Sequence, residues 1–121
     1  MSAKTEAAAR FIDHVREKRF AEAAGTLSED VVLTVPQIGD IPGRGGVETA
    51  LRMASEQGRG LERVGWSAPQ EQDEGTVLLS GKAPTGALGV VARLLRKQVA
   101  VAITCGFGDD GAINKLTIAT S

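Results

Sequence analysis

The sequence contains no tyrosine, one cysteine, one histidine and one tryptophan among 121 residues. A single cysteine excludes an internal disulfide and fits a reducing cytoplasm. With one histidine as well, a metal site would consist almost entirely of carboxylates, and no spacing of acidic residues indicates one. We therefore expect a cytoplasmic protein without a metal or other cofactor.

The chain also lacks an excess of charge of either sign, since 15 acidic residues stand against 14 basic ones. Binding to a phosphate backbone requires surplus positive charge, so nucleic acid is not an expected partner. No apolar run approaches the roughly 20 residues that cross a bilayer, and the first residues do not resemble a secretory signal. These absences predict a soluble protein without membrane association. The length predicts a single domain over residues 1–121.

The pattern of apolar residues changes from helical to extended along the chain. Steps of three and four predict helices at about 4–17 and 19–26, and GGVETALRMASEQ predicts a third helix after the glycine-rich loop GDIPGRGG. Strand patterns occur in VVLTV, LERVGWSAPQ, VLLSGKA, QVAVAITCGF and AINKLTIAT. Helices followed by a meander of antiparallel strands indicate an α+β domain.

Two regions in the second half of the chain bear on a possible site. Alternation places Val101, Ile103 and Cys105 on one face of their strand, and small residues on the opposite face, which we expect to be a dimer contact. Residues 83–98, APTGALGVVARLLRKQ, carry leucines near helical spacing and a basic end. This segment predicts an inserted helix that acts as a lid over a pocket, or as a covering or partner-binding helix.

Three segments resemble the nuclear transport factor 2 superfamily: SEDVVLTVP, PGRGGVETAL and AITCGFGDDGAINKLTI. The superfamily includes ketosteroid isomerase, limonene-type epoxide hydrolases and SnoaL-like polyketide cyclases. The resemblance implies a cone-shaped, curved antiparallel sheet wrapped around the N-terminal helices, a cystatin-like α+β barrel with an apolar pocket. It also implies a homodimer.

The resemblance places the polar groups of ketosteroid isomerase on apolar residues of this chain. The general-base aspartate falls on Val35, the oxyanion-stabilising tyrosine on Phe11, and the second oxyanion donor on Ile103. Val35 also takes the position of the acid in the polyether epoxide hydrolases. Proton abstraction beside a carbonyl needs a base and oxyanion donors, so this chain is not expected to perform that reaction in that way.

Two polar residues are the candidates for catalysis. His14 lies one helical step from Phe11, and its usual pKa suits proton transfer near neutral pH, although it is also a typical boundary histidine. Asp40 lies in the glycine-rich loop at the expected pocket mouth, where an aspartate after glycine is also ordinary turn chemistry.

A second group of candidates is apolar and is expected to line the pocket. Trp66 offers the largest apolar surface, either in the pocket or in plain packing, and its N–H needs a partner in both cases. A thiol among valines is expected to be inert. The predicted lining residues are Phe11, Val15, Val35, Trp66, Val101, Ile103, Cys105 and Leu116.

Three functions remain open on the sequence alone. The favoured one is an enzyme, a cyclase, isomerase or hydrolase acting on a small hydrophobic metabolite such as a polyketide or terpenoid. An apolar cavity can accelerate cyclisation by holding a reactive chain in a productive conformation. The alternatives are a protein that binds a hydrophobic ligand without converting it, and a dimeric interaction module.

Overall fold

The computed structural model describes residues 3–36, 38–57, 60–72, 75–84 and 98–120. Within them the α-helices are α1 (Ala3–Arg16), α2 (Phe20–Gly25) and α3 (Arg44–Glu56), and a 3₁₀ turn, η1, spans Leu61–Arg63. The strands are β1 (Leu27–Val35), β2 (Gly39–Pro42), β3 (Gly65–Trp66), β4 (Gln70–Glu71), β5 (Val77–Pro84), β6 (Gln98–Phe107) and β7 (Ile113–Thr120). The predicted α+β class is confirmed.

The strands form one mixed sheet in the order β2-β1-β7-β6-β5-β3, with β4 also paired to β5. Every pair is antiparallel except β1 with β7, which run parallel. This corrects the expected purely antiparallel sheet. A hairpin cannot join parallel neighbours, and here the chain passes through α3 and the strands β2, β3, β4, β5 and β6 before β7 reaches β1. The strand order is open, so the described sheet curls without closing into a barrel.

Two segments differ from the sequence prediction. The loop GDIPGRGG contains strand β2, which pairs with β1. The strand begins at Gly39 and is followed by Gly43, and their φ values of 106° and 83° lie where glycine is favoured. Its prolines and glycines hid the strand pattern. The segment LERVGWSAPQ, predicted as one strand, divides into η1 and the short strands β3 and β4.

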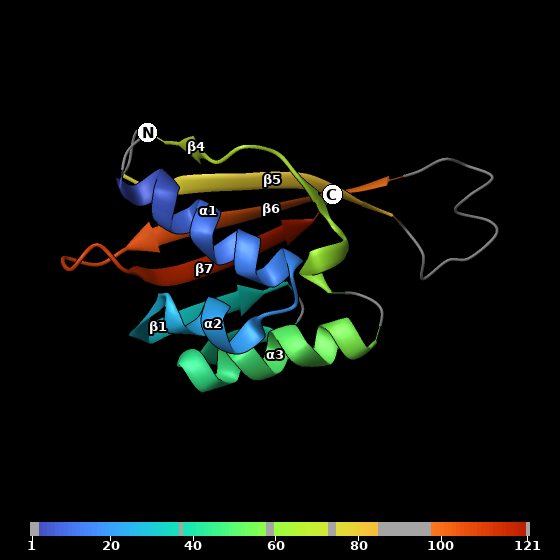
Figure 1. Cartoon of the computed structure of the whole chain (residues 1–121), viewed down its shortest axis with the longest axis horizontal. Helices are drawn as coiled ribbons and strands as arrows, with labels where there is room; N and C mark the ends of the chain where they lie inside the picture. Colours follow the sequence, from blue (N-terminus) through green and yellow to red (C-terminus); the bar gives the residue numbers. More distant parts are fainter. Residues whose placement is uncertain (1–2, 37, 58–59, 73–74, 85–97, 121) are drawn as a thin grey trace.

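The helices cover one face of the sheet, and α1 lies across the strands (Figure 1). The spacing that predicted α1 turns Phe11, Ile12 and Val15 inward, and α3 buries Val47 and Leu51. A buried phenylalanine such as Phe11, which is 1% exposed, contributes about 1.5–3 kcal/mol by leaving water. The sheet and helices thus share one hydrophobic core.

Strand alternation also agrees with the prediction. Val101, Ile103 and Cys105 are buried beneath the helices, whereas Ala100 and Thr104 are exposed on the opposite face. The helix expected within residues 83–98 falls on residues 85–97, which lie outside the described part of the chain. The lid hypothesis therefore stays a prediction.

Candidate functional site

The apolar residues predicted to line a pocket come together on the helix-covered side of the sheet. They are contributed by α1, β1, β3, β6 and β7. Phe11, Val15, Trp66, Val101, Ile103, Cys105 and Leu116 belong to one buried cluster, and Val35 is partly buried against it. Phe11, Val35 and Ile103 hold the three positions where the resemblance expects polar catalytic groups. All three therefore contribute apolar side chains to the same core. That these residues surround a ligand cavity stays a prediction.

Trp66 fixes one end of this interior. It pairs with Gly81 of β5, and Gly81 pairs with Val101 of β6, so the three residues form a row across neighbouring strands. Its Nε1 donates a hydrogen bond to the backbone oxygen of Leu61, 3.0 Å away. The indole N–H thus has the partner that burial demands, and the bond holds η1 against the end of the sheet.

Glu62, in η1, is a polar residue that the sequence analysis missed. The hydroxyl of Ser55 in α3 donates to its Oε1 at 2.7 Å, whereas Oε2 is buried and has no hydrogen-bond partner among the described residues. A Cβ on Gly60 would collide with the carboxylate, so this glycine makes room for it. Because the segment LERVGWSAPQ was predicted as one strand, Glu62 was not singled out as a candidate. The neighbouring glycine was the available signal.

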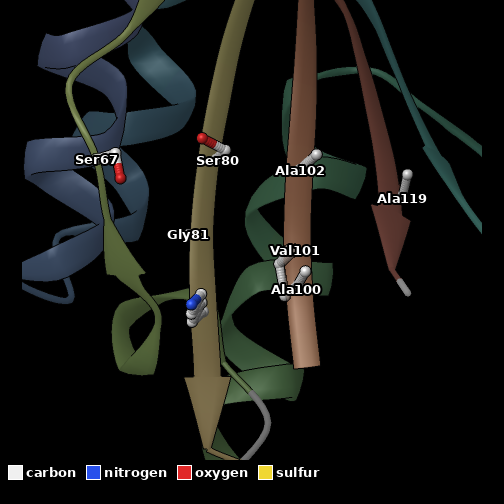
Figure 2. A pocket seen from close by; sticks show the side chains of 8 residues that line it. Ser67, Ser80, Gly81, Ala100, Val101, Ala102 and Ala119 are labelled. Atoms are coloured by element: carbon white, nitrogen blue, oxygen red, sulfur yellow. The ribbon is translucent and has the colours of Figure 1, made fainter. Parts of the chain in front are cut away.

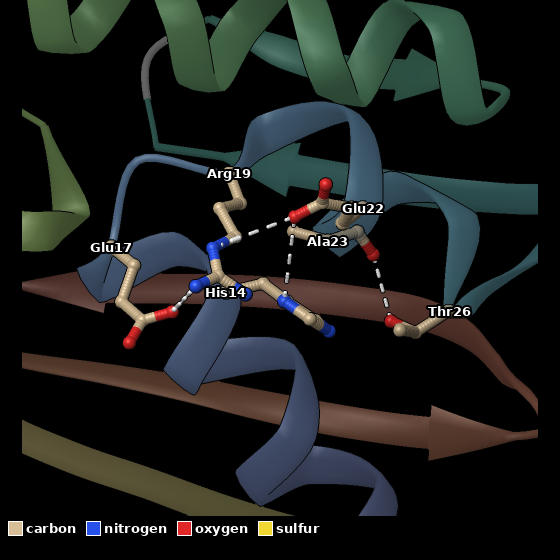
Figure 3. A network of polar contacts seen from close by, with 6 residues as sticks. All are labelled: His14, Glu17, Arg19, Glu22, Ala23 and Thr26. Atoms are coloured by element: carbon tan, nitrogen blue, oxygen red, sulfur yellow. Dashed lines mark hydrogen bonds and ion pairs between the residues drawn. The ribbon is translucent and has the colours of Figure 1, made fainter.

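His14 lies in a polar corner between α1 and α2 (Figure 3). Its Nδ1 is 3.9 Å from Oε2 of Glu22, and the same oxygen is 3.7 Å from Nε of Arg19. The histidine side chain is 24% exposed, although Nδ1 itself is buried without a hydrogen-bond partner in the described structure. Its polar neighbours are therefore surface charges of α2, as expected for a boundary histidine.

Asp40 is exposed on β2 and accepts a hydrogen bond from Oγ1 of Thr34 at 2.8 Å. Thr34 alternates with the more inward Val35 on β1, so this contact lies on the outer side of the hairpin. The polar partners of Asp40 and His14 are different residues on different elements. The two catalytic candidates do not form one constellation.

Cys105 is buried in the core among apolar side chains. Burial disfavours the charged thiolate and raises the pKa of the thiol from 9.0 to about 12. The thiol is therefore protonated at neutral pH, and its nucleophilic form is nearly absent. This agrees with the expectation of an inert cysteine.

A hollow of about 340 Å³ lies on the opposite face of the sheet, and the helices stand behind the strands in this view (Figure 2). Its lining consists mainly of small side chains, with one cation. The lining residues are Ser67, Ser80, Gly81, Lys82, Ala100, Val101, Ala102 and Ala119. This is the small-residue face that the sequence assigned to a dimer contact.

The described residues contain neither a metal-binding cluster nor a membrane-spanning helix. No group of three or more histidine, cysteine, aspartate or glutamate side chains is arranged to hold a metal ion in the described ranges. None of the helices in those ranges combines the length and apolar character needed to span a membrane.

Comparison by sequence matches the chain to no family model and to no curated protein. Comparison of folds matches a steroid delta-isomerase from Pseudomonas aeruginosa with a TM-score of 0.73 and 15% identity, covering 100% of this chain and 81% of that one. An NTF2-like protein of unknown function from Cytophaga hutchinsonii matches with a TM-score of 0.65 and 15% identity over 100% and 91% of the two chains.

A third similar structure is an epoxide hydrolase/cyclase-like enzyme with a role in pyran ring formation in the polyether salinomycin. Its TM-score is 0.66 at 12% identity, and the match covers 98% of this chain and 90% of that chain. At such identities the similarity shows the fold alone. The chain has the nuclear transport factor 2-like fold, also called cystatin-like, and the resemblance stated from the sequence is confirmed at that level.

Proposed function

We propose that this protein binds a small hydrophobic metabolite, such as a polyketide or terpenoid, on the helix-covered side of its sheet and converts it by cyclisation, isomerisation or hydrolysis. One observation carries the proposal. Apolar side chains from α1, β1, β3, β6 and β7 gather in one interior, in a fold shared with a steroid delta-isomerase and an epoxide hydrolase/cyclase-like enzyme.

The proposed mechanism relies on shape more than on proton transfer. Phe11 and Ile103 are each 1% exposed, and their side chains offer neither a base nor an oxyanion donor. An apolar wall can still accelerate a reaction by holding the two reacting ends of a flexible molecule together. Because His14 faces Glu22 and Asp40 faces Thr34, we assign them at most limited acid-base help.

A second candidate function is an interaction module or ligand-binding homodimer. The hollow on the outer face, with its alanines and serines, favours it, because small side chains allow two sheets to approach closely. An isologous dimer would place this face of one copy against the same face of another. We further propose a cytoplasmic location, on the ground that a single cysteine forms no internal disulfide and fits a reducing compartment.

The proposal is tested by a thermal-shift and native mass spectrometry screen with hydrophobic metabolites, followed by product analysis of each hit. Two tryptophan variants on β6 separate the two faces. Ile103→Trp fills the inner side and is expected to abolish binding, whereas Ala100→Trp fills the outer hollow and is expected to leave binding intact.

The outcomes separate the candidate functions. A converted ligand supports the enzyme, and a ligand recovered unchanged supports the non-catalytic binder. If no compound stabilises the wild type, or if Ile103→Trp binds as well as the wild type while its circular dichroism is native, the inner pocket is refuted. Loss of a dimer in Ala100→Trp alone would support the interaction module.

A further inference from the structure

We infer that Glu62 is the polar anchor of the proposed pocket, and that its free carboxylate oxygen selects ligands bearing a hydroxyl group on an otherwise apolar body. This inference rests on the proposed function and specifies its substrate class.

Glu62 lies in the 3₁₀ turn η1, close to one end of the sheet (Figure 1). Its 3₁₀ turn, η1, contacts both α1 and α3, and it lies beside the C-terminal end of α1, at the end of the sheet where β5 finishes and β6 begins (Figure 1). Leu61, the preceding residue, packs against the core and accepts the hydrogen bond of Trp66. Glu62 is therefore attached to the same end of the apolar interior as Trp66 and Val101.

Only one of the two carboxylate oxygens of Glu62 accepts a hydrogen bond from a described residue. Ser55 donates to Oε1 at 2.7 Å and thereby fixes the carboxylate. Oε2 is buried without a donor, and no lysine or arginine in the described part of the chain forms an ion pair with Glu62. Buried acceptors nearly always have a partner, because leaving one without a hydrogen bond is unfavourable. Oε2 is thus a buried acceptor that has a fixed position and no donor among the described residues.

A neutral hydroxyl suits Oε2 of Glu62 better as a donor than a cation does. Glu62 has apolar neighbours along the chain, since Val64 and Trp66 belong to the core and Leu61 packs against it. Bringing a cation into such an interior is far less favourable than bringing in a hydroxyl. A neutral hydroxyl donates one proton to Oε2 and leaves the rest of the ligand free to fill hydrocarbon space. The recognised class is therefore an alcohol of a polyketide- or terpenoid-like skeleton.

Gly60 provides a way to move the carboxylate without removing it. Its φ of −70° and ψ of 154° suit alanine, but the new Cβ would collide with the carboxylate of Glu62 and displace it. Gly60→Ala keeps the charge and changes its place, whereas Glu62→Leu removes the charge. Gly45→Ala is the matched control, because a Cβ there meets nothing within 4 Å.

The experiment measures affinities by isothermal titration for three matched pairs: α-terpineol and limonene, 1-naphthol and naphthalene, cyclodecanol and cyclodecane. We expect wild type and Gly45→Ala to prefer the alcohol of at least one pair by about tenfold or more, as for a hydrogen bond to a charged acceptor. Glu62→Leu and Gly60→Ala are expected to lose this preference and to bind the hydrocarbon at least as well as the wild type does.

The results distinguish this inference from the proposed function. If the wild type binds neither member of any pair, the pocket and the anchor both fall. If it binds them but the preference for the alcohol is absent, or persists unchanged in Glu62→Leu, the pocket stands and the anchor is refuted. A purely structural Glu62, with Oε2 satisfied by a bound water, predicts a lower melting temperature in Glu62→Leu with no change in preference. The anchor predicts a lost preference in Glu62→Leu whether or not the melting temperature falls, because the variant also removes the hydrogen bond from Ser55.

Discussion

Raising the pH tests whether Cys105 is as deeply enclosed as the structure shows. The pKa of its thiol is raised from 9.0 to about 12 by desolvation. At pH 8 a thiol with the usual pKa is about 10% thiolate, whereas one with a pKa near 12 is about 0.01% thiolate, so alkylation slows roughly 1,000-fold. Steric burial slows it further.

The same shift predicts a loss of stability at alkaline pH. The folded protein holds the thiol proton more tightly than the unfolded chain, so this stabilisation is complete below pH 9.0 and is lost as the pH rises toward about 12. Each pKa unit corresponds to 1.36 kcal/mol, so the full loss is about 4 kcal/mol, of which about 2 kcal/mol is lost by pH 10.5.

The assays are iodoacetamide labelling at pH 8 and urea unfolding at pH 8 and 10.5. Cys105→Ala is the control for unfolding, because it removes this titration and keeps all others. We expect the stability difference between wild type and Cys105→Ala to shrink by about 2 kcal/mol at the higher pH. Labelling of the native protein within about tenfold of the rate in urea, or a pH-independent difference, would show that the thiol is not enclosed.

Three further predictions concern the core and the candidate site. Phe11→Ala should lower the free energy of unfolding by about 3–5 kcal/mol in urea titrations, because it leaves a cavity, while the half-exposed Met53→Ala should stay within about 0.5 kcal/mol of wild type. Trp66→Phe removes the donor to the Leu61 oxygen and should lose about 1–3 kcal/mol; an unchanged midpoint would contradict that bond. His14→Gln and Asp40→Asn should each change unfolding free energy by less than about 1 kcal/mol and leave ligand conversion largely intact, and a complete loss of turnover in either would reinstate that residue as catalytic.

Local chemistry explains which elements could be read from the sequence. The spacing of apolar residues predicted α1 and α3, because a helical period places these residues on one face, which the helix buries against the core. Alternation likewise determined the buried face of β6. Strand β2 was not predicted, because its residues are typical of a turn and it is extended through its pairing with β1. Within LERVGWSAPQ, the indole of Trp66 in β3 donates to the Leu61 oxygen in η1, a contact that the alternation of apolar residues does not encode.

The sequence by itself determined the α+β class, the apolar stripes and the absence of polar groups at Phe11, Val35 and Ile103, because these follow from residue type and spacing. Tertiary structure decided the rest: the parallel pairing of β1 with β7, the placement of His14 against Glu22, and the burial of one oxygen of Glu62. Each of these depends on segments that meet only after folding. Residue spacing shows periodicity along a chain, whereas the hydrogen-bond partners and the burial of a side chain depend on which other segments pack against it in the folded protein.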